Sequence, residues 1–396
     1  YELIRQTRDI KYKIVKSYFA RKKISTGYIS FLKTALKMIE NIKHSKDGYA
    51  LEINNGKIIN SDFTYEIEEL KKDIYYLENG ERKFHQYLKD ITPGYEAELN
   101  KGIEIFSGKH YNLFVADRDG TINNYCGRYN SSVQSVYNAI FLTQFARKCT
   151  NNSIIITSAP LENTGLREMS IFLEDTFILA GSKGREYYDN LGVKHCLTIS
   201  NEKQNKLDIV NNKLLELVKR PEYEIFSLVG SGLQFKFGQT TIARQDINRS
   251  ISKSASEKFR TVVEDIVSGA DPSSQYLKIE DTGKDIEIIL TISENGEKTG
   301  VKDFDKGDGI KYIIDQLKLD FRSGSNLICG DTISDVPLLK ASMEFTENTY
   351  SIFVLKDKEL KEKVRNICPN SFFVSSPDIL ITLLNNISIQ EGLNNE

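Results

Sequence analysis

The amino-acid sequence predicts an α/β protein with three parts: an N-terminal α-helical domain, a Rossmann-like core built on a parallel sheet, and an inserted α/β cap. Over residues 1–105, apolar residues recur at helical spacing. From Tyr111 onward, short apolar strands alternate with helices, which is the pattern of βα units around a parallel sheet. Two helices with paired strands interrupt this alternation and indicate an inserted antiparallel sheet. The expected domains are therefore 1–105 (helical), 106–186 with 302–388 (core) and 187–301 (cap).

The helical domain is expected to contain about three helices, over 4–19, 29–42 and 65–88, with a short extended piece over 50–59. Its first 23 residues hold eight basic residues against two acidic ones, a net charge of +6. Such a stretch is either a docking face for an acidic partner or an anionic membrane, or a solvated helix face, which charge runs on helices usually are. The role expected for the domain is dimerisation or the docking of another protein.

The core and the cap are expected to consist of short strands and helices. In the core, strands are predicted at 112–116, 153–156, 176–179 and 326–329, and helices at 131–148 and 311–317. In the cap, helices are predicted at 202–219 and 254–268, and strands at 224–228, 234–237, 240–244, 276–279 and 285–292. Residues from 388 to the end are expected to fray.

The composition excludes several classes of protein. The 53 basic and 55 acidic residues give a net charge of −2, so there is no overall basic signature for nucleic acid. The five cysteines are far apart and form no CxxC pair, which argues against a disulfide scaffold and suits a reducing compartment, so we expect a cytoplasmic protein. The longest apolar runs, 154–156 and 379–384, fall far short of the roughly 20 residues of a transmembrane helix. Whether residues were removed before Tyr1 stays open.

Carboxylates carry the chemical signal of this sequence, because the four histidines never come close enough for an HExxH or His/Cys zinc pattern. Residues 112–121 form an apolar strand that delivers Asp117 and Asp119 into a glycine-containing loop, followed by the hydroxyl of Thr121. In open α/β sheets, ligands bind at the carboxyl ends of strands, where these aspartates lie. Two carboxylates so close repel each other unless a cation lies between them, and Mg²⁺ suits such all-oxygen ligation.

A second stretch, residues 326–335, repeats this arrangement with an apolar strand, a glycine turn and the carboxylates of Asp331 and Asp335. Between the two stretches, Thr157 closes the strand at 154–156, and Lys306 opens a predicted helix. Phosphoryl transfer needs these parts: charge neutralisation, a positioned nucleophile and protonation of the leaving oxygen. The competing interpretation is a pair of turns whose carboxylates cap helix N-termini.

The four stretches resemble, in order, the four motifs of haloacid-dehalogenase-like phosphatases, each after its apolar strand. The resemblance implies a haloacid-dehalogenase core in which Asp117 is the nucleophile that forms an aspartyl-phosphate. It implies that Asp119 protonates the leaving alkoxide and later activates water. It further implies that Lys306 and Thr157, or its neighbour Ser158, hold the phosphoryl oxygens.

The same resemblance implies a Mg²⁺ ion bound by the Asp117 carboxylate, the Asp119 backbone carbonyl and Asp331, with Asp335 in support. One residue departs from the pattern. Arg118 stands between the two aspartates, where an apolar or aromatic residue is common in members that act on sugar phosphates. The effect of Arg118 stays open at this point.

The cap region resembles that of trehalose-6-phosphate phosphatases, nearest to the branch with an N-terminal helical domain. Three stretches carry the resemblance: Gly181-Ser-Lys-Gly-Arg-Glu186, Gln234-Phe-Lys236 and Ile286-Glu-Ile288. They depart from the family pattern in that Lys183 replaces a histidine, Gln234 replaces a glutamate, and an Arg-Pro pair is missing after the last stretch. The substrate-binding residues expected by resemblance are Thr121, Lys183, Glu186, Gln234, Lys236 and Glu287. The alternative is that the cap residues are ordinary polar residues on an exposed strand.

Together the resemblances imply Mg²⁺-dependent hydrolysis of trehalose 6-phosphate to trehalose and phosphate. A disaccharide is neutral and rich in hydroxyl groups, so its recognition suits the carboxylate, amide and amine groups of the cap. The alternatives are a phosphatase of another sugar phosphate, such as sucrose 6-phosphate, a sugar phosphomutase, or a regulatory scaffold that no longer turns over substrate.

Overall fold

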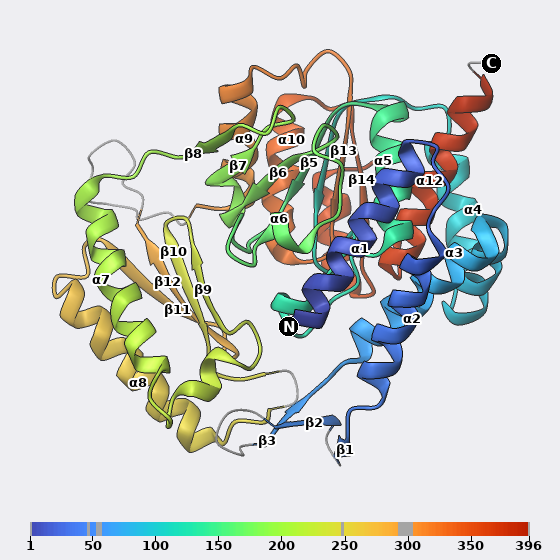
Figure 1. Ribbon diagram of the computed structural model, residues 1–396. Helices are drawn as coiled ribbons and strands as arrows, with labels where there is room; N and C mark the ends of the chain where they lie inside the picture. Colours follow the sequence, from blue (N-terminus) through green and yellow to red (C-terminus); the bar gives the residue numbers. More distant parts are fainter. Residues whose placement is uncertain (1, 46–47, 53–57, 247–248, 292–303, 395–396) are drawn as a thin grey trace.

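The protein is organised in three parts, which are arranged around the α/β core (Figure 1). The computed structural model describes all residues except 1, 46–47, 53–57, 247–248, 292–303 and 395–396. In Figure 1 the cap, with its four strands and two long helices, lies at the lower left, and the N-terminal helices pack against the core on the right. The predicted fold class, an α/β core with an inserted α/β cap and an N-terminal helical domain, is confirmed.

The core is built on an eight-stranded sheet in the order β15-β14-β13-β4-β5-β6-β7-β8. The strands are β4 (Tyr111–Asp117), β5 (Thr150–Ile156), β6 (Ile178–Gly181), β7 (Glu186–Tyr188), β8 (Lys194–Cys196), β13 (Ser325–Gly330), β14 (Thr349–Val354) and β15 (Ser371–Val374). The strands from β15 to β6 pair in parallel, whereas β7 and β8 add antiparallel pairs at one edge. Both faces of a parallel sheet are covered, so its strands are nearly continuous apolar runs, as in β4.

Helices cover the two faces of this sheet. α5 (Val136–Cys149) and α12 (Pro377–Asn394) pack on one face together with the N-terminal domain. α9 (Lys306–Leu317), α10 (Val336–Phe345) and α11 (Lys358–Ile367) pack on the other. The expectation that residues from 388 onward fray is wrong, because α12 continues helically to Asn394. Among the helices that the structure describes, none has the length and apolar character needed to cross a membrane.

The N-terminal domain contains one helix more than expected. Its elements are α1 (Glu2–Phe19), α2 (Thr26–Glu40), β1 (His44–Ser45), β2 (Gly48–Glu52), β3 (Ile58–Ser61), α3 (Thr64–Ile91) and α4 (Tyr95–Phe106). The additional helix, α4, begins directly after Gly94, whose left-handed backbone (φ 79°) turns the chain. β2 and β3 cover the ends of the extended piece expected over 50–59, and residues 53–57 lie outside the described residues.

Part of the basic stretch in α1 contacts the protein itself. Lys11 is buried and pairs with Asp73 of α3 at 2.9 Å. Arg8 donates to the carbonyl oxygens of Arg167 and Ser170 in the core, at 3.3 and 3.1 Å. Two of the eight basic side chains therefore tie α1 to its neighbours.

The cap has its own apolar core beneath an antiparallel sheet in the order β11-β12-β10-β9. Its elements are α7 (Asn201–Val218), β9 (Leu233–Lys236), β10 (Gln239–Ala243), α8 (Lys253–Ala270), β11 (Leu277–Asp281) and β12 (Asp285–Leu290). The strand expected over 224–228 is wrong. These residues form a 3₁₀ turn (Glu224–Ser227) that buries Phe226 against Phe259 of α8, with a ring separation of 3.7 Å. Ile292, expected to end the last strand, lies outside the described residues.

The core sheet continues past residue 186, where the sequence suggests that the cap begins. β7 pairs with β6, β8 pairs with β7 at the sheet edge, and the first cap helix, α7, begins at Asn201. All five cysteines are free, and Cys196, at the end of β8, is exposed whereas the other four are buried. The division of the chain into three domains remains a prediction.

Candidate active site

The four sequence motifs converge at the carboxyl edge of the parallel strands. Asp117 is the last residue of β4, Thr157 directly follows β5, and Asp331 directly follows β13. Because β13, β4 and β5 are neighbours in the sheet, their ends lie side by side. Lys306 is the first residue of α9, whose N-terminus is closed by reciprocal hydrogen bonds between Asp305 and Asp308.

Three carboxylates and one ammonium group form the centre of the site. Asp117, Asp331 and Asp335 each place an oxygen within 4.8 Å of the others. The Nζ of Lys306 donates to Asp117 Oδ1 at 2.5 Å and to Asp335 Oδ1 at 2.6 Å. The other oxygen of Asp335 accepts the backbone N–H groups of Asp331 and Thr332, both at 3.0 Å. Both oxygens of Asp335 are thus engaged by the protein.

Negative charge exceeds positive charge in this cluster, and the pKa values reflect the excess. Burial raises the pKa of Asp117 to about 7, although Lys306 opposes the shift. Burial and the neighbouring Asp117 raise the pKa of Asp331 to about 8. Burial also acts on Asp335, but Lys306 and the two backbone N–H groups outweigh it and lower its pKa. The raised pKa values mean that Asp117 and Asp331 lose their protons reluctantly at neutral pH. A divalent cation between them would stabilise both carboxylates in their ionised form.

The loop after Asp117 packs directly on Asp331. Gly120 has a φ of 90°, and a Cβ at this position would lie 2.2 Å from Asp331 Oδ2, so only glycine fits. The Oγ1 of Thr121 lies 3.1 Å from Asp331 Oδ1 and 3.4 Å from Asp117 Oδ2. The structure therefore places Thr121, expected to bind substrate, fully buried between two carboxylates of the cluster.

Arg118 contacts the carboxylate of Asp119, its neighbour in the chain, rather than a member of the cluster. Its Nη1 also lies 3.0 Å from the hydroxyl of Ser132. Its Nη2 donates to the carbonyl oxygens of Ser132 and Met169, the latter at 3.2 Å. Arg118 is 1% exposed, whereas the side chain of Asp119 keeps 22% of its surface exposed. Asp119 thus reaches solvent while the guanidinium behind it does not.

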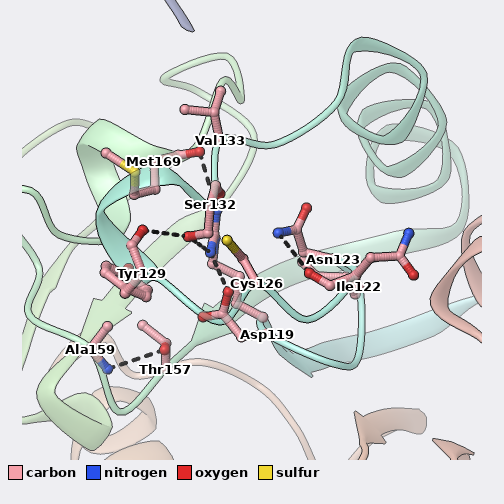
Figure 2. A network of polar contacts seen from close by, with 12 residues as sticks. Asp119, Ile122, Asn123, Cys126, Tyr129, Ser132, Val133, Thr157, Ala159 and Met169 are labelled. Atoms are coloured by element: carbon pink, nitrogen blue, oxygen red, sulfur yellow. Dashed lines mark hydrogen bonds and ion pairs between the residues drawn. The ribbon is translucent and has the colours of Figure 1, made fainter. Parts of the chain in front are cut away.

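Thr157 begins the loop that follows β5 and contacts the 3₁₀ turn of Ser182–Gly184. Its hydroxyl accepts the N–H of Ala159 at 3.2 Å (Figure 2), and its carbonyl accepts the N–H of Lys183 at 2.8 Å. The start of α9 packs against the same turn, since a Cβ on Gly309 would lie 2.0 Å from the Lys183 carbonyl oxygen. Lys183, Thr157 and the helix that carries Lys306 are therefore held together.

Glu186 lies in the core rather than facing the cap. Its Oε1 accepts the N–H of Leu161 at 3.1 Å and the hydroxyl of Ser182 at 2.7 Å, and its other oxygen lies 3.6 Å from Lys194. The carboxylate expected to bind substrate thus joins the loop after Thr157 to the 182–184 turn.

The cap residues expected to bind substrate lie on adjacent strands. Gln234 and Lys236 are on β9 and Glu287 is on β12, with the Nζ of Lys236 4.0 Å from Glu287 Oε1. Gln234 donates to the carbonyl oxygen of Ser231 at 3.0 Å. Burial lowers the pKa of Lys236, with Lys183 of the core adding to the effect and Glu287 opposing it. The structure brings Lys236 and Glu287 together but places Gln234 in a local turn contact.

The turn between β9 and β10 touches the core directly. The N–H of Phe237 donates to the hydroxyl of Ser182 at 2.9 Å, and Arg185 donates to the side chain of Gln239 at 3.4 Å. The sequence motifs predict neither these contacts nor the partners of Arg118. A backbone N–H or carbonyl leaves no signature in a sequence, and the residues that meet lie far apart along the chain.

A groove of about 1210 Å³ lies elsewhere, between α1 and residues 162–192. None of the residues predicted for the site lines this groove, whose lining includes Arg5, Arg8 and Arg167. The groove is therefore separate from the carboxylate cluster.

Two family models match the chain. One, described as Trehalose-6-phosphate phosphatase, C-terminal, matches residues 114–380. The other, described as Trehalose-6-phosphate phosphatase N-terminal helical bundle domain, matches residues 1–94.

Curated relatives and a solved structure are similar over most of the chain. Alpha,alpha-trehalose-phosphate synthase (UDP-forming) 1 of Aphelenchoides avenae is 32% identical over 358 residues, covering 89% of this chain and 30% of the relative. Trehalose-phosphatase of Caenorhabditis briggsae is 29% identical over 413 residues, covering 95% of this chain and 92% of the relative. The C-terminal domain of C. albicans trehalose-6-phosphate phosphatase has a TM-score of 0.46 at 14% identity, covering 74% of this chain and 96% of that one. The chain spans about a third or less of the length of the first curated relatives it matches.

Proposed function

Because the chain belongs to the trehalose-6-phosphate phosphatase family, we propose that it hydrolyses trehalose 6-phosphate to trehalose and phosphate. The observation that carries the proposal is the buried cluster of Asp117, Asp331, Asp335 and Lys306 at the ends of β4 and β13. This cluster lies within residues 114–380, where the family model matches.

In the proposed first step, a carboxylate oxygen of Asp117 attacks phosphorus and forms an aspartyl-phosphate. The bond from phosphorus to the sugar oxygen breaks, and Asp119 gives its proton to the departing alkoxide. Lys306 and Thr157 hold phosphoryl oxygens during this transfer. In the second step, Asp119 accepts a proton from water, which attacks phosphorus and releases phosphate and the free Asp117 carboxylate.

The donor set of the site fits Mg²⁺. The ion prefers oxygen ligands, and two carboxyl groups with raised pKa values lie within reach of each other here. We assign the Asp117 and Asp331 carboxylates and the Asp119 backbone carbonyl as ligands. Asp335, with both oxygens engaged by the protein, supports them by orienting Lys306 and the 331–332 backbone. When bound, Mg²⁺ supplies charge neutralisation for the phosphoryl group.

For the sugar, we propose recognition by Lys183 of the core and by Lys236, Glu287 and Gln234 of the cap, with closure of the cap excluding water. Glu186 contributes by fixing the 182–184 turn that carries Lys183. The expected hinges lie near Gly184 and at 302–305, of which residues 302–303 lie outside the described residues. We further propose a cytoplasmic location, and dimerisation or docking as the role of the helical domain.

The test is phosphate release from a panel of sugar phosphates, with Mg²⁺ and with EDTA. We expect trehalose 6-phosphate to be the preferred substrate and EDTA to abolish its turnover. Preference for sucrose 6-phosphate would change the substrate but keep the chemistry. The absence of turnover on every phosphate ester, with Mg²⁺ present, would leave the regulatory scaffold as the explanation.

A further inference from the structure

Arg118 is a cation buried deep in the core, directly beside the side chain that the proposed mechanism uses as acid and base. Burying a guanidinium group is costly unless its donors are satisfied. Here the two terminal nitrogens have four acceptors: the Asp119 carboxylate, the hydroxyl and carbonyl of Ser132, and the carbonyl of Met169 (Figure 2). The ring of Tyr129 lies 5.6 Å from the guanidinium carbon.

These contacts fix the direction in which Arg118 points. Ser132 belongs to the loop that follows the first motif, and Met169 ends the short helix α6 (Leu166–Met169) of a separate segment. Nη2 bonds both carbonyls, and because the guanidinium group is planar, these two bonds fix the direction in which Nη1 points. In that orientation Nη1 faces the Asp119 carboxylate. A lysine would offer a point charge without this fixed plane.

We propose that Arg118 is a positioning residue for the reaction: it holds the Asp119 carboxylate where the proton of the leaving group is exchanged. This inference rests on the proposed phosphatase function. Arg118 acts through Asp119 and has no described contact with Asp117, Asp331 or Lys306. Its contribution is therefore confined to the steps in which a proton moves at the Asp119 carboxylate.

The helical domain supports this arrangement through Tyr65 of α3. The Tyr65 hydroxyl donates to the carbonyl of Val133 at 2.9 Å, next to Ser132, and accepts from the side chain of Asn123 at 2.8 Å. The backbone N–H of Asn123 donates in turn to the carbonyl of Arg118 at 2.9 Å. One hydroxyl from the helical domain thus bonds both ends of the loop that seats Arg118.

The experiment compares two substrates that differ in their need for a proton. The alkoxide of trehalose 6-phosphate must be protonated as it leaves, whereas the phenolate of p-nitrophenyl phosphate leaves readily without a proton. Replacing Arg118 by Met (Arg118→Met) should lower kcat/KM for trehalose 6-phosphate by about 10²-fold and leave kcat/KM for p-nitrophenyl phosphate nearly unchanged. The ratio kcat/KM is compared because it reports the steps up to release of the alcohol or phenol, and not the hydrolysis of the aspartyl-phosphate that both substrates share. Asp119→Asn is the reference variant and should give the same selectivity with a larger loss.

Arg128→Met is the matched control. Arg128 lies on the same loop, is largely buried and pairs with Glu66 at 2.6 Å, but it has no described contact with Asp119. It should lower kcat/KM for the two substrates by similar factors. A selective loss of kcat/KM in Arg128→Met, an equal loss on both substrates in Arg118→Met, or a higher kcat/KM in Arg118→Met would each overturn the proposal.

Arg118→Lys keeps the test informative if Arg118→Met does not fold, which circular dichroism would reveal. The lysine retains the charge but has one nitrogen in place of the two that here bond the carbonyls and Asp119 separately, so we expect an intermediate loss of kcat/KM confined to trehalose 6-phosphate. An equal loss on both substrates would again overturn the proposal. If the wild-type protein hydrolyses a different alkyl phosphate, the same comparison is made with that ester. In that case the substrate assignment fails, but the positioning role of Arg118 is still tested. If it hydrolyses no ester, both proposals fail.

Discussion

Two buried clusters of charged side chains differ in how completely their charges are neutralised. In the candidate active-site cluster, Lys306 bonds Asp117 and Asp335, Asp331 lies beside these two carboxylates, and burial raises the pKa of Asp117 to about 7. In a second cluster, which we call the joint cluster, Glu69 of α3 and Asp378 of α12 bind Lys72 at 2.9 and 2.8 Å. Burial opposes the ionisation of Asp378, but Lys72 and neighbouring donors outweigh it and lower its pKa.

Neutral hydrogen-bond donors account for much of the difference. Asp378 accepts the hydroxyl of Tyr137 at 2.6 Å and the amide of Asn124 at 3.0 Å, and Glu69 accepts from Asn124 and Ser135. Such donors stabilise buried carboxylates in their ionised form. The joint cluster has two carboxylates to one ammonium group, is satisfied by these neutral donors, and connects the helical domain to the core. The candidate active-site cluster has three carboxylates to one ammonium group, and this larger excess of negative charge favours binding of a cation.

The largest expected effect is on turnover, which a substitution in the candidate active-site cluster should lower and one in the joint cluster should not lower directly. Asp117→Asn removes the proposed nucleophile and should lower the hydrolysis of trehalose 6-phosphate on the order of 10⁴-fold or more. The free energy of unfolding of the metal-free protein should not fall, because the substitution removes excess negative charge. Phosphate release and urea unfolding measure the two quantities. Asp315→Asn, at an exposed carboxylate of the same region on α9, is the control and should change neither. Appreciable turnover in Asp117→Asn would contradict the mechanism.

Breaking the joint cluster should affect stability instead. Lys72→Met leaves two buried carboxylates without their cation and should cost about 3–5 kcal/mol in the free energy of unfolding. The adjacent Lys71 offers a matched control, because it pairs with Glu40 at 2.9 Å with 48% of its side chain exposed. Lys71→Met should cost about 0–1 kcal/mol. Urea unfolding tests both variants, and equal losses would show that the joint cluster is not the stronger contact.

The pH dependence of stability should report the excess charge of the active-site cluster. The pKa values of Asp117 and Asp331 rise from 3.8 to about 7 and about 8, so the folded metal-free protein binds more protons than the unfolded chain between these values. The contribution of both groups to the free energy of unfolding should therefore decrease as the pH rises from about 4 to about 8. Mg²⁺ favours the ionised carboxylates and should flatten this decrease. Unfolding curves across the window, in EDTA and in Mg²⁺, measure the effect, and identical slopes would contradict it.

The smallest effect is expected where the helical domain reaches the reactive loop. Tyr65→Phe removes one hydroxyl that bonds Val133 and Asn123, and should cost about 1–3 kcal/mol in the free energy of unfolding. It should also lower kcat/KM modestly for trehalose 6-phosphate but not for p-nitrophenyl phosphate. Tyr75→Phe is the control on the same helix, because Tyr75 stacks on Tyr87 through its ring at 4.5 Å. An equal effect of the two variants on both measurements would argue against a link through Tyr65.

The sequence was sufficient to predict that the residues of the candidate active-site cluster lie together, because their signal is local. Each of Asp117, Thr157 and Asp331 stands at the end of an apolar strand, and parallel strands bring their ends to one edge. The 3₁₀ turn over Glu224–Ser227 was predicted wrongly as a strand, since a short apolar run is compatible with either structure. Tertiary packing of Phe226 on Phe259 decides between them.

The contacts of Arg118 and Glu186 could not be predicted in the same way. Arg118 bonds backbone carbonyls, one of them 51 residues away, and any residue type can supply a carbonyl. Glu186 matched a family stretch by sequence, but its carboxylate faces Leu161 and Ser182 within the core. Side-chain direction at such positions depends on the fold around them, not on the local pattern.

The exposed thiol at the end of β8 offers a place to attach a reporter dye. Cys196 is exposed while the other four cysteines are buried, so a maleimide fluorophore would react at one position in the folded protein. The hydroxyl of Tyr312 on α9 donates to the Cys196 carbonyl at 2.8 Å, which ties this point to the core, and the first cap helix starts at Asn201. With a second dye introduced on α8, energy transfer between the two would follow the opening and closing of the cap one molecule at a time.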